Sequence, residues 1–301
     1  MKPRTDHWSD FGMDTMSLAG PLESKLRAIR NAGFRQVMLS AQDLAGHAGG
    51  IDAAVRALKA SGLRPTGVQA LHDYEGLDGA LHAYKVDVAK SLLEMCKAVG
   101  SPLLVVNSSV LAHTSADRDA IARDLRKLAM LALPSGIKVA YVALSWGRVV
   151  RDFPTALDIV GRAEMPNLGI GIDSFHVLAA RSSLDELEMV LPETILLVQL
   201  SDFMVTDLPS LRDRISTANH LRVFPGAGLH SAQLAELVQS ITAVGYRGDY
   251  SFQVFNDDYR QLDPATVAAH ARRAAVWLGE DVLKRAVPLA WSPRLAGTER
   301  G

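Results

Sequence analysis

The chain has 301 residues, of which 48% are hydrophobic and 22% are charged. These are ordinary values for a soluble globular protein, and they exclude a disordered chain, a collagen-like fibre and a disulfide scaffold. Its 32 Lys and Arg residues are balanced by 33 Asp and Glu residues, so the charge gives no sign of a nucleic-acid partner.

Cys96 is the only cysteine, which excludes an intrachain disulfide and a cysteine-based zinc site. No stretch stays apolar over the ~20 residues that a membrane-spanning helix needs, and the N-terminus lacks the apolar core of a signal peptide. We therefore expect a cytoplasmic protein with no membrane partner, in a reducing compartment.

Short apolar runs alternate with amphipathic stretches along the chain. Eight runs are expected as strands: Met13–Leu18, Gln36–Ser40, Pro65–Gln69, Leu103–Asn107, Lys138–Val142, Leu168–Asp173, Ile195–Leu200 and Tyr250–Val254. Eight stretches are expected as helices: Leu22–Ala32, Ile51–Ser61, Ala80–Val99, Asp117–Leu133, Pro154–Arg162, Leu184–Val190, Ser231–Val244 and Pro264–Leu283. Strands that alternate with helices indicate parallel βαβ units.

Two architectures accommodate such units. A closed (β/α)8 TIM barrel uses eight of them over about 250 residues, whereas a doubly wound open sheet often carries a glycine-rich phosphate turn after its first strand. The first expected strand runs into residues 17–22 (SLAGPL), which lack that motif. We therefore predict an α/β fold, a single-domain TIM barrel over residues 1–286, and a C-terminal tail over residues 287–301.

The active site of a TIM barrel lies at the C-terminal ends of its strands. Candidate side chains stand at those ends or in the long connection Phe203–His230: His72, Asn107, Trp146, Asp173, His176, Gln199, Arg222 and Gln253. Since barrel closure brings the strand ends around one small area, we expect these side chains to face a common cavity. A connection as long as Phe203–His230 is uncommon unless it is functional.

Each candidate also has a purely structural interpretation. Asp173 would cap the next helix, and His176 would be a hydrogen-bonded core histidine. Trp146 and Phe255 would pack rather than stack on a ligand. The remaining alternatives are structural amides at Gln199 and Gln253 and a solvated loop residue at Arg222.

Several phrases in the sequence resemble the xylose-isomerase-like TIM barrels of the sugar phosphate isomerase/epimerase superfamily, and within it the bacterial 3-dehydroshikimate dehydratases. They are residues 17–26 (SLAGPLESKL), 73–76 (DYEG), 144–148 (LSWGR), 173–179 (DSFHVLA), 198–202 (VQLSD), 224–226 (FPG) and 255–257 (FND). The resemblance implies a TIM barrel that acts on a small hydroxylated substrate.

This resemblance also implies a divalent-metal site with four strand-end ligands, usually two glutamates, an aspartate and a Gln or His. The corresponding positions here are Val142, Asp173, Gln199 and Gln253. Val142 has no ligand atom, and Gln253 offers a neutral amide where a carboxylate is expected. Because the affinity for hard divalent cations follows the number of carboxylate charges, we expect either no metal or a weakly bound Mg²⁺ or Mn²⁺ on Asp173 and Gln199.

The resemblance implies a lyase of the dehydratase type, or an isomerase, acting on a hydroxylated carbonyl acid or sugar such as 3-dehydroshikimate. The predicted catalytic residues are Asp173, His176 and His72, since histidine changes charge near neutral pH. Arg222 would pair with a substrate carboxylate. The other predicted substrate-binding residues are Gln199, Gln253, Trp146 and Asn107.

A second hypothesis is a non-catalytic barrel that binds a metabolite or a partner subunit, because both glutamate positions are lost together. An endonuclease-like barrel is a third hypothesis, and the balanced charge and missing metal ligands argue against it. A homodimer through an exposed apolar helix face is compatible with either of the first two.

Overall fold

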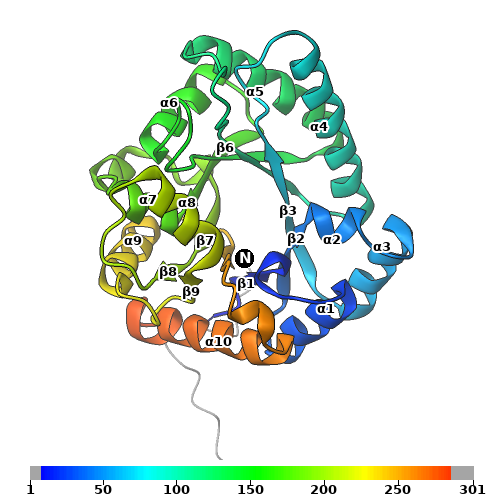
Figure 1. The fold of residues 1–301 in the computed structure, drawn as a ribbon, viewed down its shortest axis with the longest axis vertical. Coiled ribbons are helices and arrows are strands. Elements are labelled where there is room, and N and C mark those ends of the chain that lie inside the picture. The colour runs from blue at the N-terminus through cyan, green and yellow to red at the C-terminus, as the bar shows by residue number, and fades with distance from the viewer. Residues whose placement is uncertain (1–7, 286–301) are drawn as a thin grey trace, which may run out of the picture.

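Eight parallel strands close into a barrel within residues 8–285, the part of the chain that the computed structural model describes (Figure 1). Around the barrel the strands are β1 (Phe11–Asp14), β10 (Tyr250–Phe252), β7 (Ile195–Leu200), β6 (Leu168–Asp173), β5 (Lys138–Val142), β4 (Leu103–Asn107), β3 (Arg64–His72) and β2 (Gln36–Ser40). Pairing of β1 with both β2 and β10 closes the sheet. The TIM-barrel prediction is therefore confirmed, and the open doubly wound sheet is excluded.

The α-helices lie outside the strands or over the barrel mouth. They are α1 (Leu22–Asn31), α2 (Ala41–Ala45), α3 (Gly50–Ser61), α4 (Gly79–Val99), α5 (Arg118–Ala132), α6 (Phe153–Ala163), α7 (Ser174–Ala180), α8 (Leu211–His220), α9 (Ser231–Ala243) and α10 (Pro264–Val276). Sequence signals fix many of their ends. Asp117 and Asp152 cap the N-termini of α5 and α6 with their side chains, and Gly100 ends α4 in a left-handed conformation.

The core has two layers because alternate side chains of a strand point to opposite faces. In β4, Leu103 and Val105 belong to the cluster that fills the barrel interior, whereas Leu104 and Val106 belong to the larger cluster that includes the helix faces. Pairing also sets the strand ends level with one another: Asn107 lies opposite Val142, and Asp173 lies opposite Gln199. The register thus places predicted site residues side by side.

Most predicted elements are confirmed to within a few residues, and three are corrected. The first strand ends at Asp14, where the Asp14 side chain caps a short 3-10 turn, Thr15–Ser17. The helix after β6 is α7, whereas the predicted stretch Leu184–Val190 holds only a 3-10 turn at Asp185–Met189. The predicted last helix changes after Val276 into a π-helical turn, Trp277–Val282.

The long connection after β7 contains structure that the sequence pattern did not indicate. A two-stranded antiparallel sheet joins β8 (Asp202–Phe203) to β9 (Arg222–Val223), with α8 between them. Ser210 and Asp213 form a reciprocal capping box that starts α8. After this segment, the chain returns to the barrel at Arg222.

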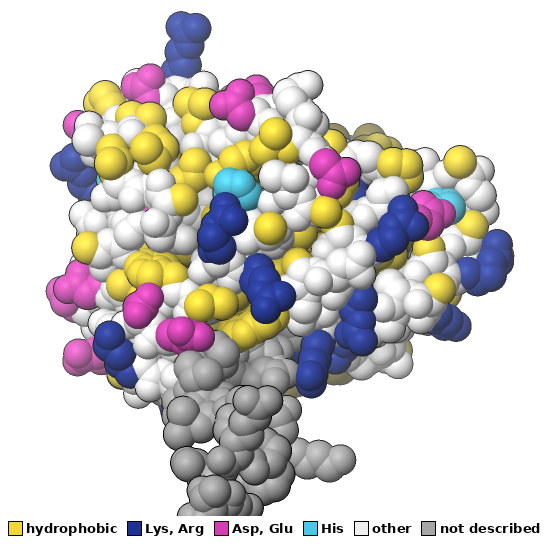
Figure 2. All heavy atoms as spheres, turned by 90° about the horizontal axis from the view of Figure 1, so that it is seen from below, with side chains coloured by type: hydrophobic (Ala, Val, Ile, Leu, Met, Phe, Trp, Pro, Cys, Tyr) yellow, Lys and Arg dark blue, Asp and Glu magenta, His cyan; other side chains and the backbone are white. Residues whose placement is uncertain are grey.

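The predicted tail over residues 287–301 lies outside the described residues, so the boundary at residue 286 stays a prediction. Along residues 8–285, no helix combines the length and the apolar character needed to cross a bilayer. On the face in Figure 2, Lys and Arg side chains alternate with acidic and hydrophobic ones, as the balanced composition predicts.

Candidate functional site

A cavity of about 540 Å³ opens at the C-terminal ends of the barrel strands, and we call it the mouth cavity. Every residue predicted to serve the site lies on its wall: His72, Asn107, Trp146, Asp173, His176, Gln199, Arg222 and Gln253. Val142 lies there too. The structure thus brings together residues that are far apart in the sequence, as barrel closure requires.

A buried ion pair stands at the centre of this wall. Asp173 ends β6, and its Oδ1 accepts a hydrogen bond from the Phe175 backbone N–H at 2.8 Å, which caps α7. Its Oδ2 accepts from Nη1 of Arg222 at 2.9 Å. Burial alone would raise the pKa of Asp173, but the charge of Arg222 and the hydrogen bonds from Arg222 and the Phe175 backbone hold that pKa below its ordinary value. Asp173 is therefore an anion in the folded protein.

Arg222 is a built-in part of the site rather than a solvated loop residue. Its Nε donates to the Ala218 carbonyl oxygen at 2.9 Å, and its Nη1 also donates to Ser201 Oγ at 3.3 Å. The guanidinium lies 4.4 Å from the centre of the Phe175 ring and 5.5 Å from that of Phe255. No hydrogen bond joins its Nη2 to another described residue, so Nη2 is the donor left for a ligand.

His176 is held as a neutral hydrogen-bond donor. Its Nδ1 accepts from the Ser145 backbone N–H at 3.2 Å, so the neutral ring carries its proton on Nε2. Nε2 lies 3.6 Å from Asp173 Oδ2, which is too far for a hydrogen bond. Burial lowers the pKa of His176 to about 4, against the opposing charge of Asp173. The edge of Trp146 packs on the ring, with 4.9 Å between centres.

Three buried amides form a cluster across the cavity floor. Nε2 of Gln199 and Nε2 of Gln253 both donate to Oε1 of Gln69, at 2.8 and 3.2 Å. The Gln69 Nε2 in turn contacts the sulfur of Met16 at 3.4 Å. This arrangement leaves the carbonyl oxygens of Gln199 and Gln253 as acceptors for ligand hydroxyl groups. Gln69 ends an expected strand, and only its contacts reveal that it organises the other two amides.

The rim of the cavity carries an exposed histidine. Nδ1 of His72 lies 3.3 Å from Nδ2 of Asn107, and the Lys85 ammonium donates to the His72 carbonyl oxygen at 2.7 Å. Partial removal of water lowers the pKa of His72 against the opposing charge of Asp73, and the charge of Lys85 lowers it a little further. The ring is therefore neutral at pH 7 and can accept a proton.

A buried carboxylate supports the rim from behind. Glu75 Oε1 accepts from the Ser109 backbone N–H at 2.6 Å and from the Tyr141 hydroxyl at 2.9 Å, whereas its Oε2 is buried without a partner among the described residues. Burial raises the pKa of Glu75 to about 7. Glu75 belongs to the phrase 73–76 (DYEG) that carries the family resemblance, but it was not among the predicted site residues.

Several further residues line the cavity without having been predicted: Met16, Gln42, Gln69, Asn219, His220 and Arg260. Asn219 and His220 end α8, so the unusual length of the connection Phe203–His230 was the signal that could have found them. Arg260 lies in the loop after β10.

The donors at the four strand-end positions do not fit a tight divalent-cation site. Asp173 is the sole carboxylate among them, and it already neutralises Arg222. Val142 presents methyl groups, and the Gln199 and Gln253 amides are engaged with Gln69. In the stretch from residue 8 to residue 285, no group of three or more His, Cys, Asp or Glu side chains is placed to hold a metal ion. Hard divalent cations need more oxygen charge than this set provides.

The chain is similar to curated enzymes. A 3-dehydroshikimate dehydratase from Pseudomonas aeruginosa is 34% identical over 267 residues, which are 88% of this chain and 41% of the relative. An inosose isomerase from Bacillus licheniformis is 26% identical over 71% of this chain and 76% of the relative. The chain thus spans less than half the length of the Pseudomonas protein.

Two solved structures share the fold. A xylose isomerase-like TIM barrel/4-hydroxyphenylpyruvate dioxygenase fusion protein superposes with a TM-score of 0.85 and 30% identity, covering 93% of this chain and 45% of that one. IOLI protein, whose structure contains a zinc atom, gives a TM-score of 0.79 at 19% identity and covers 90% of this chain and 98% of its own.

The model of the family "Xylose isomerase-like TIM barrel" matches residues 26–279, which include the whole of the mouth-cavity wall except Met16. This chain belongs to the xylose isomerase-like TIM barrel family.

Proposed function

We propose that the mouth cavity binds a small hydroxylated carbonyl acid or sugar, of which 3-dehydroshikimate is the type, and acts on it as a dehydratase or an isomerase. The observation that carries this proposal is the convergence of Asp173, Arg222, His176 and His72 on one cavity with the amide cluster. The printed activities of the relatives from Pseudomonas aeruginosa and Bacillus licheniformis support the same substrate class.

The chemistry needs no oxidant. In a dehydration, His72 takes a proton from the carbon next to the substrate carbonyl. It then returns that proton to the hydroxyl group on the following carbon, whose carbon–oxygen bond breaks to release water. A carbon–carbon double bond forms between the two carbons. His176 Nε2–H and Arg222 Nη2 would stabilise the oxygen that becomes negative during proton removal. The carbonyl oxygens of Gln199 and Gln253 would hold the remaining hydroxyl groups.

We also propose that the mouth cavity binds no divalent cation tightly, and that a cation on Asp173 and Gln199 would be weakly held. The ion pair of Asp173 with Arg222 supports this view, since the guanidinium already supplies a positive charge beside the carboxylate.

Turnover of 3-dehydroshikimate by the protein, followed by proton NMR, tests the proposal. The assay should be run after chelation with EDTA and again with added Mn²⁺. We expect product under both conditions. The His72→Ala and His176→Ala variants should still bind the substrate but form no product. Absence of turnover under both conditions would contradict the catalytic proposal.

A second candidate function is binding without catalysis, and one observation favours it. Val142 and Gln253 replace both expected carboxylates, and the Gln253 amide is tied into the cluster with Gln69. Calorimetric binding of 3-dehydroshikimate without turnover would assign this function instead.

Two further proposals concern the cellular location and the oligomeric state of the protein. We propose a reducing, cytoplasmic location, which is supported by the presence of a single cysteine, Cys96, as a buried free thiol. A homodimer could use α8, on which Leu211 and Ile215 are exposed one turn apart. Light scattering of the purified protein tests the second.

A further inference from the structure

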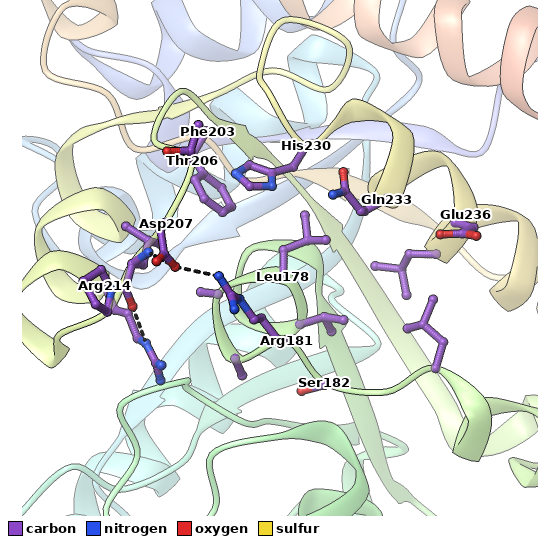
Figure 3. Close-up of a pocket in the computed structure, with 17 residues that line it drawn as sticks. Leu178, Arg181, Ser182, Phe203, Thr206, Asp207, Arg214, His230, Gln233 and Glu236 are labelled. Atoms are coloured by element: carbon purple, nitrogen blue, oxygen red, sulfur yellow. Dashed lines mark hydrogen bonds and ion pairs between the residues drawn. The ribbon is translucent and has the colours of Figure 1, made fainter.

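A second cavity, which we call the side pocket, lies outside the barrel and has a volume of about 690 Å³. Its walls are α7 with residues 181–184, the connection 203–209 and the start of α9 (Figure 3). Nothing in the proposed reaction uses it. The side pocket is larger than the mouth cavity and is within the size range of small-molecule sites.

The side pocket combines an apolar surface with polar groups. Leu178 lies on its wall beside Arg181, and the His230 ring packs on Phe203 with 4.0 Å between ring centres (Figure 3). His230 Nε2 contacts the Val205 carbonyl oxygen at 2.8 Å, so Nδ1 is the acceptor of the neutral ring. A flat apolar ligand would contact the Leu178 side chain and the His230 ring here.

Charged and polar groups stand on opposite sides of that apolar surface. Arg181 donates through Nη2 to Asp207 at 2.8 Å, which leaves its other guanidinium N–H groups for a carboxylate (Figure 3). Across the pocket, Gln233 and Glu236 of α9 present side-chain oxygens. Ser182 Oγ, also on the wall, is buried without a hydrogen-bond partner among the described residues. A buried hydroxyl without a partner is unfavourable in the folded protein.

The side pocket and the mouth cavity share α7 as a wall. Asp173 and His176 face the mouth cavity, whereas Val177 and Leu178, the next residues of the same helix, line the side pocket. A ligand that shifts α7 would therefore also move Asp173, which caps this helix, and His176.

Two chains of contacts connect the pockets besides α7. Arg214 of the side pocket donates through Nη1 to the Ser145 carbonyl oxygen at 3.3 Å, and the Ser145 backbone N–H donates to Nδ1 of His176. Phe203 packs on Phe175 with 5.1 Å between ring centres, and Phe175 in turn lies against the Arg222 guanidinium.

We propose that the side pocket binds a small aromatic acid that carries a hydroxyl group, and that its occupation is transmitted through α7 to His176 and Arg222 in the mouth cavity. The carboxylate would pair with Arg181, the ring would lie against Leu178 and His230, and the hydroxyl would donate to Gln233 or Glu236. The proposal does not depend on whether the mouth cavity catalyses a reaction, because it concerns binding alone.

The test uses 4-hydroxybenzoate as the probe and the protein labelled with 5-fluorotryptophan. The chain contains four Trp residues, and a Trp146→Phe variant assigns the fluorine resonance of Trp146, which packs on His176. We expect a saturable shift of the Trp146 resonance with 4-hydroxybenzoate. The uncharged probe 4-hydroxybenzamide should bind at least tenfold more weakly, because Arg181 favours a carboxylate.

Matched variants locate the binding. Arg181→Gln removes the guanidinium, and Gln233→Phe fills the pocket from an exposed position on α9; both should abolish the saturable shift. Arg123→Gln is the control, because Arg123 is likewise exposed and paired with an exposed aspartate, Asp117, but lies on α5. Circular dichroism confirms that each variant is folded.

The proposal is overturned if 4-hydroxybenzoate produces no saturable change in any resonance, or if its binding survives in both Arg181→Gln and Gln233→Phe. Binding that depends on both residues but leaves the Trp146 resonance unchanged would overturn the transmission to the mouth cavity. Turnover of 3-dehydroshikimate is a separate measurement, so the two proposals can fail independently.

Discussion

Arg222 and Asp173 form an ion pair with 2.9 Å between Nη1 and Oδ2, and each side chain is only 3% exposed. The two residues come from β9 and the end of β6, on separate sheets of the structure. Arg222 thus places a positive charge beside Asp173, the sole carboxylate among the four strand-end positions considered for a divalent cation.

Replacement of one partner of this pair should lower the free energy of unfolding substantially. Arg222→Met leaves the Asp173 carboxylate buried without its counter-charge, and we expect a loss of about 3–5 kcal/mol in the free energy of unfolding. Arg162→Met serves as the control, because Arg162 pairs with Asp119 and Asp158 at the surface and such pairs contribute less than about 1 kcal/mol. Urea unfolding measures both, and equal losses would contradict the prediction.

Restoring carboxylates should create a metal site. In a Val142→Glu/Gln253→Glu double variant, two new carboxylates join Asp173 on the same cavity wall. We expect Mn²⁺ to raise the melting temperature of this variant and to bind stoichiometrically by metal analysis. The natural protein should show neither effect. A Val142→Gln variant adds a ligand oxygen without charge, and a comparable Mn²⁺ effect in it would count against the role of charge.

In the amide cluster, removal of one hydrogen-bonding partner should destabilise the protein more than removal of all three. Gln69→Leu removes the acceptor that both Gln199 and Gln253 use, leaving buried N–H groups unpaired, and we expect a loss of about 1–3 kcal/mol. The triple variant with leucine at all three positions leaves no such donor and should be more stable than Gln69→Leu alone. If the triple variant is the less stable of the two by urea unfolding, the cluster has another role.

Glu75 should make stability fall as the pH rises. Burial raises its pKa from 4.5 to about 7, so the folded protein holds a proton that the unfolded chain releases above pH 4.5. The stabilisation by this group is fully present below pH 4.5 and is lost as the pH rises through 7. Glu75→Gln removes the titration, and between pH 4.5 and 8 it should gain about 3 kcal/mol relative to the natural protein.

Urea unfolding at a series of pH values measures the Glu75 effect. Glu94→Gln is the control, because Glu94 is exposed and paired with Lys97 on α4. Parallel pH profiles for the natural protein and Glu75→Gln would refute the prediction. The Tyr141 hydroxyl bond to Glu75 favours the ionised carboxylate, so Tyr141→Phe should shift the pH dependence of the natural protein to higher pH.

The barrel could be predicted because strand and helix periods are local properties of the sequence. The strands β2, β4, β5, β6 and β7 were predicted with the bounds that the structure has. The errors fall where tertiary contacts override the local pattern. The first strand ends at Asp14, whose side chain caps a 3-10 turn. Asp173 caps α7 directly at the strand end, and the stretch Leu184–Val190 forms no regular helix.

The sequence by itself determined the alternation of strands and helices, the closed parallel barrel, and the opening at which the predicted polar residues meet, because each strand end in such a barrel must face the same opening. Only the tertiary structure decided which of those residues form hydrogen bonds and ion pairs with one another. Arg222 is bound to Asp173, His176 is held by a backbone amide, and the glutamines are bound to Gln69. Such pairings depend on distances between atoms from distant segments, which spacing along a chain does not encode.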